Sequence, residues 1–300
     1  MPSSSSRIVA VFGATGRQGS SVVEALLADG TFAPRAITRN PDSETALKLK
    51  ERGVEVVKGD NGDKASLVAA LQGCEAVFGV TVPHIPPFRN AGQSELIQGK
   101  NMVDAAKEAH VEFFIFSSLP GLKKLSGGKY SGSIFDDKAD TEEYLKASGL
   151  ANATIHLGAF FETHHTLTKT SSGFDLAHFG PDTPQPFTWI KHDVGESVLA
   201  ILKNYTDPSK GVSGKTYQVV TAVMAYTALV ALTAKALGVE VTFTSLPTTG
   251  IPQFDEMALR YCEYSSILPT SPVPNPDLVA LGAKFSTVEQ FMEDVKERYS

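Results

Sequence analysis

The chain has 300 residues, of which 42% are hydrophobic and 20% are charged, and its formal net charge is −6. This length and composition allow a large core, in one elaborated domain or in two joined domains. The acidic balance gives no basic surface for nucleic acid, and no apolar run approaches the roughly 20 residues that span a bilayer. Since no hydrophobic signal region precedes the first predicted strand, we expect a cytoplasmic protein without nucleic-acid or membrane partners.

The two cysteines, Cys74 and Cys262, are isolated in the sequence. Neither belongs to a CxxC motif, and no His/Cys spacing is typical of a metal site. We therefore expect small buried or half-buried thiols, no disulfide and no metal.

The most informative segment follows the first apolar run, residues 8–12. Three glycines spaced three apart come next, and then an amphipathic segment over residues 20–27, so the order predicts a strand, a turn and a helix. Glycine is needed where the chain reverses, where phosphate oxygens approach and where the helix presses on the sheet. The free amides and the dipole of the helix N-terminus favour a pyrophosphate. The sequence thus predicts a dinucleotide site on Gly13, Ala14, Thr15, Gly16, Arg17, Gln18 and Gly19.

Predicted strands and helices alternate up to residue 157. Helix-ending glycines at Gly53, Gly73 and Gly149 and an N-cap at Asp63 support the pattern. It predicts an α/β domain over residues 1–157 with a doubly wound parallel sheet, the Rossmann fold. The predicted strands are 8–12, 33–38, 54–58, 76–82, 113–116 and 153–157, and the predicted helices are 20–27, 43–52, 64–71, 94–109 and 134–147.

Residues 158–300 have a looser rhythm and are expected to form a smaller mixed α/β subdomain, interleaved with the first. We expect an irregular connection over 173–186, an extended proline-rich loop over 269–276, and the substrate crevice between the two halves. Asp193 is predicted to cap a helix, and Ser286-Thr-Val-Glu289 to form a capping box for the last helix, through about Lys296. Helices are predicted at 194–204 and 227–237, and strands at 216–220 and 241–245.

The end of the second predicted strand selects the cofactor. NAD sites usually place a carboxylate there, whereas sites for the 2′-phosphate of NADP place cations there. This strand contains no acid and ends at Arg39, and Arg17 could reach the same corner. An arginine fork binds phosphate in two places, so the pair favours NADP, although Arg39 is alternatively a solvated cation. Asp60 either accepts from the adenine amino group or forms a turn.

Several motifs resemble the NmrA-like proteins, which are atypical members of the short-chain dehydrogenase/reductase superfamily. They are the GATGxxG turn, Thr38-Arg39-Asn-Pro41, Gly59-Asp60, Phe135-Asp-Asp-Lys138 with Glu142-Glu-Tyr-Leu145, and Leu157-Gly-Ala-Phe-Phe-Glu162. The resemblance covers nearly the whole chain. It implies either an NADP-sensing regulator that binds a partner protein or a small-molecule reductase related to isoflavone and quinone reductases.

The same resemblance assigns expected roles to individual residues. It implies that the pyrophosphate lies on the glycine turn and the 2′-phosphate on Arg39, with Arg17 nearby. It places the adenine edge at Asp60 and Asn61, and the nicotinamide ribose hydroxyls at Lys138. It places the strand end Thr81, Val82 and Pro83 along the cofactor ribose, and Ala159 and Phe160 beside the nicotinamide ring.

The expected catalytic centre departs from the usual superfamily pattern. Most members have a Tyr four residues before the Lys, and this Tyr protonates the reduced carbonyl. Here Ile134 stands at that position and cannot transfer a proton, and Gly132 argues against a helix that reaches back to Tyr130. Lys138 is then a cofactor clamp, an acid/base group as in the isoflavone-reductase-like branch, or a lone surface lysine.

Weaker catalytic candidates lie on neighbouring strand ends and loops. Ser118, with Ser117, could hold a substrate carbonyl or could cap a helix. His84 either donates a proton above the nicotinamide or is a solvated loop residue. His164 and His165 are adjacent in sequence and lack a third ligand at metal spacing.

Two functions from different classes follow. One is an NADPH-dependent reductase of a small carbonyl, enone, quinone or imine substrate, which the C-terminal half could bind. The other is a catalytically silent NADP(H)-sensing regulatory protein that acts through a protein partner, and the missing Tyr favours it.

Overall fold

The computed structural model describes residues 7–83, 93–162, 167–179, 182–248, 250–251, 255, 263 and 271–299. The strands are β1 Ile8–Phe12, β2 Ala33–Thr38, β3 Glu55–Lys58, β4 Ala76–Gly79, β5 Phe113–Ser118, β6 Asn152–Leu157, β7 Ala159–Phe160, β8 Leu167–Lys169, β9 Gly173–Phe179, β10 Gln185–Thr188, β11 Thr216–Val219, β12 Ala222–Met224 and β13 Glu240–Leu246. The helices are α1 Arg17–Asp29, α2 Glu44–Glu51, α3 Lys64–Leu71, α4 Glu95–Glu108, α5 Leu122–Leu125, α6 Ser133–Ala147, α7 Gly195–Asn204, α8 Tyr226–Leu237, α10 Pro276–Ala280 and α11 Val288–Tyr299, with a π-helix Ile190–Val194 and a 3-10 turn Pro208–Lys210.

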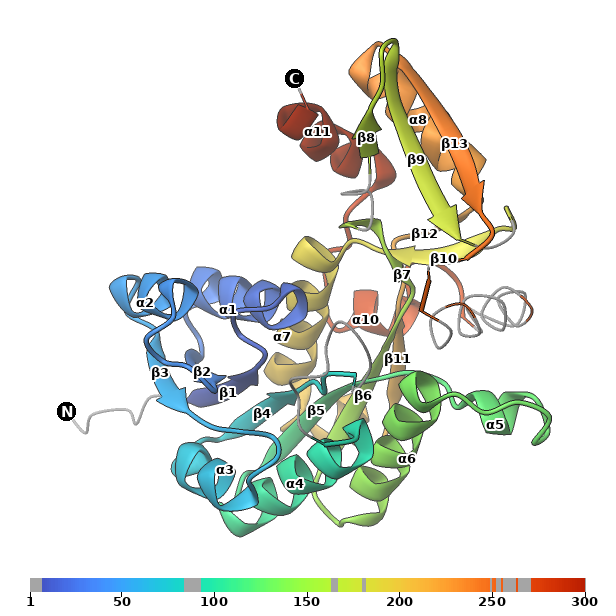
Figure 1. Ribbon diagram of the computed structural model, residues 1–300. Coiled ribbons are helices and arrows are strands. Elements are labelled where there is room, and N and C mark those ends of the chain that lie inside the picture. The colour runs from blue at the N-terminus through green and yellow to red at the C-terminus, as the bar shows by residue number, and fades with distance from the viewer. Residues whose placement is uncertain are drawn as a thin grey trace.

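Seven parallel strands form the central sheet, in the order β11-β6-β5-β4-β1-β2-β3 (Figure 1). Helices α1, α2 and α7 cover one face, and α3, α4 and α6 cover the other. Successive residues of β1 therefore enter two different cores, Val9 on the α1 side and Ala10 on the α4 side. This double burial explains the continuous apolar run and confirms the predicted Rossmann fold.

The helix boundaries in this half follow from local chemistry. The side chains of Ser43, Asp63 and Ser94 accept hydrogen bonds from the first-turn amides of α2, α3 and α4. Gly53 and Gly73 follow α2 and α3 with positive φ angles of 81° and 73°, as predicted. These residues fix where each helix begins and ends.

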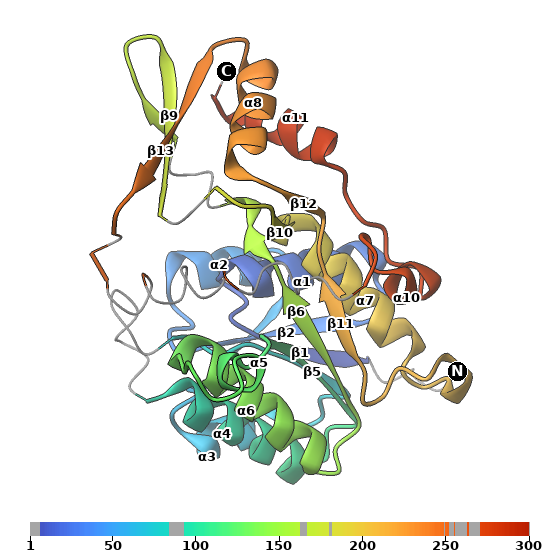
Figure 2. The ribbon, with the colours of Figure 1, turned by 90° about the vertical axis from the view of Figure 1, so that its right-hand side faces the viewer.

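The C-terminal half contributes to both parts of the molecule. β11 is the edge strand of the central sheet and α7 packs on α1, whereas α8 and α11 pack beside the sheet β13-β9-β8. A separate core joins these outer elements, with Phe161, Phe187 and Phe291 stacked on one another. Figure 2 shows β6 leading from the central sheet toward β10 and the outer elements.

The predicted irregular connection over 173–186 is wrong, because β9 and the first residues of β10 lie within it. Gly173 is needed where β9 meets β13, since a Cβ atom there would overlap the carbonyl oxygen of Glu240. The partner strand is more than 60 residues away in sequence. The signal for β9 is that the large apolar residues Phe174 and Leu176 stand on either side of the polar Asp175.

Two predicted caps are also wrong. Thr287 and Gln290 exchange the hydrogen bonds of a capping box at the start of α11, one residue later than predicted, and α11 continues to Tyr299. No side chain caps α7, and Asp193 instead accepts from the amide of Ser286 at 2.8 Å.

The proline-rich segment ends in α10, which begins at Pro276, so it is not extended throughout.

Candidate functional site

The parallel strands bring the predicted cofactor residues to one edge of the sheet. Phe12 of β1 is level with Ile37 of β2, and Thr38 is level with Lys58 of β3. The glycine turn, Arg39 and Asp60 therefore follow three neighbouring strands at their carboxyl ends. The segment after β4 lies on the other side of β1, at the point where the strand order reverses. Such a switch point is where open α/β sheets bind ligands.

The glycine turn forms a backbone cradle at this edge. Gly13 has a φ of 62°, which favours glycine, and a Cβ atom at Gly19 would overlap its carbonyl oxygen. The N-terminus of α1 carries no side-chain cap, and its first turn contains no acidic residue. Thr15, Gly16 and Arg17 are exposed. The amide of Gly16 donates to the carbonyl oxygen of Gly13 at 2.8 Å, and the exposed, uncapped helix end beside it fits a phosphate group.

Two side chains of the turn add polar groups. The Oε1 atom of Gln18 is buried and has no hydrogen-bond partner among the described residues. The charge of Arg17 acts on Glu162, whose carboxylate accepts from the amides of Ile190 and Lys191. Burial raises the pKa of Glu162 above its ordinary value, and the amides and Arg17 oppose that shift. The π-helix that Glu162 binds packs against α1, which begins at this turn.

The surroundings of Asp60, which follows β3, are compatible with both of its predicted roles, as an acceptor for the adenine amino group and as a turn-forming residue. Its Oδ1 atom accepts from the amide of Gly62 at 2.9 Å, which is a turn-forming contact. Its Oδ2 atom has no partner among the described residues. Asn61 is half-buried, and its carbonyl oxygen accepts from the side chain of Asn101. Arg39 is exposed at the end of β2, and its role stays a prediction.

Lys138 belongs to a buried cluster at the centre of the edge. Its Nζ atom donates to the hydroxyl of Thr81 at 2.7 Å and forms an ion pair with Glu95. The hydroxyl of Thr81 in turn donates to the same carboxylate at 2.6 Å. The side chains of Lys138 and Glu95 are only 10% and 2% exposed, so Lys138 is not a lone surface lysine.

Helix α4 supplies the residues that hold the segment after β4. β4 ends at Gly79, three residues earlier than predicted. The side chain of Gln98 then binds both the amide and the carbonyl oxygen of Val82, at 3.2 and 2.9 Å. Pro83 follows and is half-buried. Neither Glu95 nor Gln98 was predicted from the sequence, because no motif marks them.

The other predicted candidates have distinct surroundings. Ser118 is 1% exposed, and its hydroxyl donates to the carbonyl oxygen of Lys138 at 3.1 Å. α6 begins at Ser133, so Tyr130 lies outside the helix, as predicted. Ala159 and Phe160 form β7 and are half-buried. Residues outside the described part of the chain include His84, His164, His165 and Cys262, whereas Cys74 is buried.

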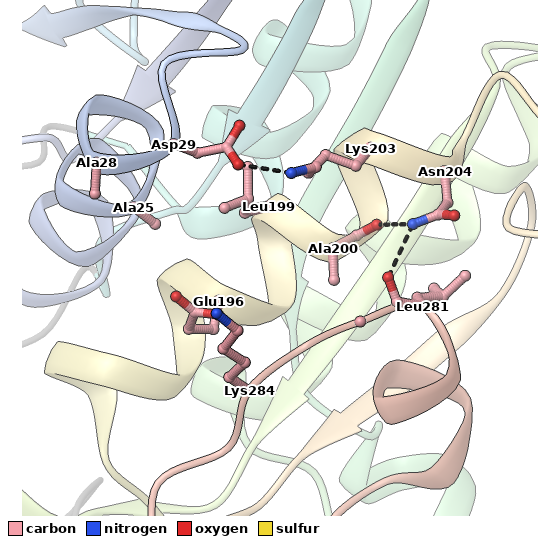
Figure 3. A pocket seen from close by; sticks show the side chains of 11 residues that line it. Ala25, Ala28, Asp29, Glu196, Leu199, Ala200, Lys203, Asn204, Leu281 and Lys284 are labelled. Atoms are coloured by element: carbon pink, nitrogen blue, oxygen red, sulfur yellow. Dashed lines mark hydrogen bonds and ion pairs between the residues drawn. The ribbon is translucent and has the colours of Figure 1, made fainter.

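A cavity of about 500 Å³ lies away from this edge, between α1, α7 and residues 281–284 (Figure 3). Asp29 and Lys203 form an ion pair in its wall. Asp29 is the last residue of α1, so at a rise of 1.5 Å per residue the helix separates it from the glycine turn by roughly 18 Å. This cavity is not part of the cofactor edge.

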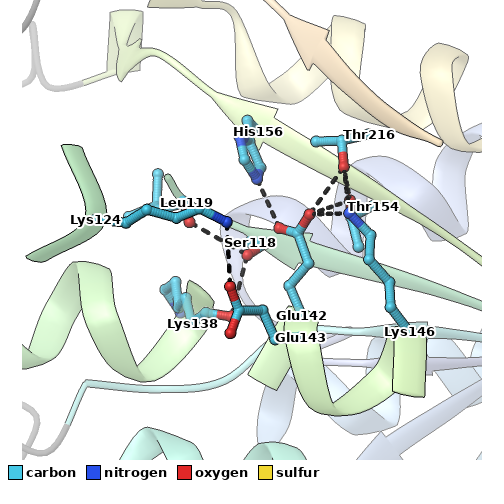
Figure 4. A network of polar contacts seen from close by, with 10 residues as sticks. All are labelled: Ser118, Leu119, Lys124, Lys138, Glu142, Glu143, Lys146, Thr154, His156 and Thr216. Atoms are coloured by element: carbon cyan, nitrogen blue, oxygen red, sulfur yellow. Dashed lines mark hydrogen bonds and ion pairs between the residues drawn. The ribbon is translucent and has the colours of Figure 1, made fainter. Parts of the chain in front are cut away.

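A second polar network ties α6 to the edge of the sheet (Figure 4). The buried Glu142 carboxylate contacts His156 at 2.7 Å, Lys146 at 2.6 Å and Thr216 at 2.8 Å. Burial by itself would raise the pKa of Glu142, but the hydrogen bonds and charges of His156 and Lys146 outweigh it. The pKa of Glu142 therefore lies far below its ordinary value, and the carboxylate is ionised.

The family is decided by the extent of the sequence match. A model of the NmrA-like family matches residues 5–291. The chain belongs to the NmrA-like family. One relative, the NmrA-like family domain-containing oxidoreductase FrzB of Cladobotryum sp, is 31% identical over 217 residues. That match covers 66% of this chain and 65% of the relative, so the chain spans just under two thirds of that protein's length.

Solved structures share the fold of this NmrA-like chain. NmrA, a negative transcriptional regulator in complex with NADP, superposes with a TM-score of 0.76 and 21% identity, over 98% of this chain and 95% of that one. The NADPH-dependent quinone oxidoreductase QOR2 of Escherichia coli, complexed with NADPH, has a TM-score of 0.71 and 22% identity, over 97% and 100%. At these identities the likeness shows the fold.

The described part of this NmrA-like protein contains neither a metal-binding cluster nor a membrane-spanning helix. No group of three His, Cys, Asp or Glu side chains in the described ranges could hold a metal ion. No helix among the same residues is long and apolar enough to cross a membrane.

Proposed function

We propose that this chain binds NADP(H) and is an NADPH-dependent reductase of a small carbonyl, enone, quinone or imine substrate. The observation that carries the proposal is the uncapped glycine cradle beside a strand end that presents Arg39 and no acid. A carboxylate at that strand end would repel a 2′-phosphate, whereas an arginine binds it. The family and the NADP and NADPH complexes of its structural neighbours support the same cofactor.

Different residues of the chain would bind different parts of the cofactor. The amides of the glycine turn bind the pyrophosphate, and Arg39 with Arg17 binds the 2′-phosphate. Ala159 and Phe160 would flank the nicotinamide ring and shield it from water. When bound, NADPH supplies the hydride.

Lys138 is the proposed proton donor of the reaction. An ammonium group has three N–H donors, and among the described residues two of them bond to Thr81 and Glu95. The third N–H remains for the cofactor site, where it would donate either to a ribose hydroxyl or to the oxygen that gains a proton. With Ile134 at the usual Tyr position, Lys138 is the ionisable side chain of this helical turn that contacts the segment after β4, since Asp136 and Asp137 bind backbone amides instead.

A second candidate function is an NADP(H)-sensing regulator without turnover. The specific observation that favours it is Ile134, which is 8% exposed and packed where the proton-donating Tyr would stand. The likeness to NmrA, a negative transcriptional regulator, is compatible with it.

Cofactor binding and turnover are tested separately. Calorimetry with NADP and with NAD tests binding, and absence of heat with both would contradict the cofactor assignment. NADPH oxidation is then followed with aldehydes, quinones, enones and imines. We expect turnover, with kcat about a hundredfold lower in Lys138→Ala because the acid is lost.

The control is Lys124→Ala, since Lys124 is an exposed lysine paired with Glu143 outside the site. It should bind and turn over like the native protein. NADP binding without turnover on any substrate class would overturn the reductase and support the sensor.

A further inference from the structure

Glu95 is a buried acid that the proposed chemistry does not use. It is the first residue of α4 and is 2% exposed. A carboxylate is costly to bury unless it is paired and hydrogen-bonded. Here the Glu95 carboxylate pairs with the Lys138 ammonium group of α6 and accepts a hydrogen bond from the Thr81 hydroxyl, which lies in the segment after β4.

Capping does not account for this acid. The N-terminus of α4 is already satisfied by Ser94, which accepts from the amide of Ile97, and by Asp137, which accepts from the amide of Leu96. The Glu95 side chain is directed to Lys138 instead. The helix end favours a negative charge at this position, and this stabilises the carboxylate as the partner of Lys138.

The contacts fix the ammonium group from two sides. Thr81 and Glu95 come from different elements, and the hydroxyl of Thr81 bonds to both charged groups. A lysine side chain otherwise has several rotamers of similar energy. Because two N–H groups of the Lys138 ammonium group are held by hydrogen bonds, its tetrahedral geometry fixes the direction of the third.

We propose that Glu95 is the positioning residue of the cofactor site, which acts on bound NADP(H) through Lys138. The proposal rests on the proposed function, because Lys138 must meet the cofactor. It assigns Glu95 no contact with the cofactor itself. Its effect on cofactor affinity must therefore vanish when Lys138 is absent.

A double-mutant cycle tests this coupling, with NADPH affinity measured by calorimetry. We expect Glu95→Gln to weaken NADPH binding about tenfold, because the ion pair that holds Lys138 is replaced by a weaker hydrogen bond to a neutral amide. Lys138→Met should weaken it at least as much. In the Lys138→Met background, Glu95→Gln should have no further effect.

Two further variants separate positioning from folding. Glu95→Asp keeps the charge and should recover part of the affinity, whereas a purely structural role would not depend on charge. Glu108→Gln, at the other end of α4 in an exposed pair with Lys64, is the matched control and should bind normally. If Glu95→Gln does not fold, Glu95→Asp replaces it in the cycle, because it keeps the charge but shortens the reach toward Lys138.

The outcomes are distinguishable from a failure of the proposed function. Independent, additive losses from Glu95→Gln and Lys138→Met would overturn the positioning role. A native protein without NADPH binding would overturn the proposed function first.

Discussion

Among single residues, Arg39 is the one that we propose selects the cofactor. It follows β2 at the carboxyl edge, where the described residues of β2 contain no carboxylate. Its guanidinium group can bind the 2′-phosphate that distinguishes NADP from NAD. Gln18, by contrast, belongs to the glycine turn, which we propose binds the pyrophosphate that both cofactors share.

Replacing Arg39 should therefore change selectivity more than binding in general. We expect Arg39→Ala to weaken NADP binding at least about tenfold, with little change for NAD, because the lost contact is charge-assisted. Calorimetric Kd values for both cofactors measure the effect. Arg52→Ala, which removes an exposed arginine paired with Glu24, is the control. An unchanged NADP/NAD ratio would show that Arg39 does not select the cofactor.

Residues of the site differ in how far the sequence could predict them. Gly13 and Gly19 were predictable, because their backbone angles and close contacts are intrinsic to the turn. Glu95 and Gln98 were not, because their roles depend on how α4 packs against α6 and the end of β4. A glutamate at the first position of a helix is ordinary in sequence, and only the fold brings Lys138 to it.

At the scale of elements, the Glu142 network joins α6 to β6 and β11 through Glu142 and His156, which lie largely out of water, and through the exposed Lys146. The folded-state pKa of Glu142 is depressed below the ordinary value of 4.5. Its contribution to stability is therefore present above that value and is lost as the pH falls below it.

Glu142→Gln should thus destabilise the protein mainly at neutral pH. We expect a loss of about 3 kcal/mol in the free energy of unfolding near pH 7, since a buried pair is broken. The difference from the native protein should narrow as the pH is lowered below about 4. Urea unfolding near pH 7 and below about pH 4 measures the free energy of unfolding of both proteins. Glu143→Gln, which changes an exposed neighbour, is the control. A difference that does not depend on pH would contradict the assignment.

Elements were predictable where their signals are local. Helix α3 has its N-cap at Asp63 and its terminal Gly73 in adjacent sequence, and it was predicted with correct bounds. β9 was missed because its partner β13 is distant in sequence and because glycine and proline on either side suggested a loop. Long-range pairing therefore decided the structure there.

Across the whole molecule, Asp193 links three distant segments. It is fully buried, and it accepts from the amide of Ser286, from the hydroxyl of Thr221 and from His192 at 3.0 Å. The hydrogen bond to Asp193 raises the pKa of His192 above its ordinary value. The C-terminal segment is thus tied to the π-helix beside α1.

Asp193→Asn keeps the shape but replaces an accepting oxygen with an amide donor. We expect a loss of about 1–3 kcal/mol in the free energy of unfolding, because a buried donor is left without a partner. Limited proteolysis should also cut the segment 271–299 sooner. Asp277→Asn, in an exposed pair with Lys215, should change either measurement little. Native-like behaviour of Asp193→Asn would show that the link is not needed.

The return of β11 to the central sheet limits how the chain can be divided. β11 pairs with β6, the last strand of the first half, from Thr216 to Val219. A fragment that stops at Leu157 would lack this neighbour. The edge of β6 would then expose unpaired backbone amides and carbonyls, with which strands of other chains could pair. The dinucleotide unit is therefore not a detachable module, and its solubility outside the intact polypeptide depends on a strand encoded some 60 residues downstream.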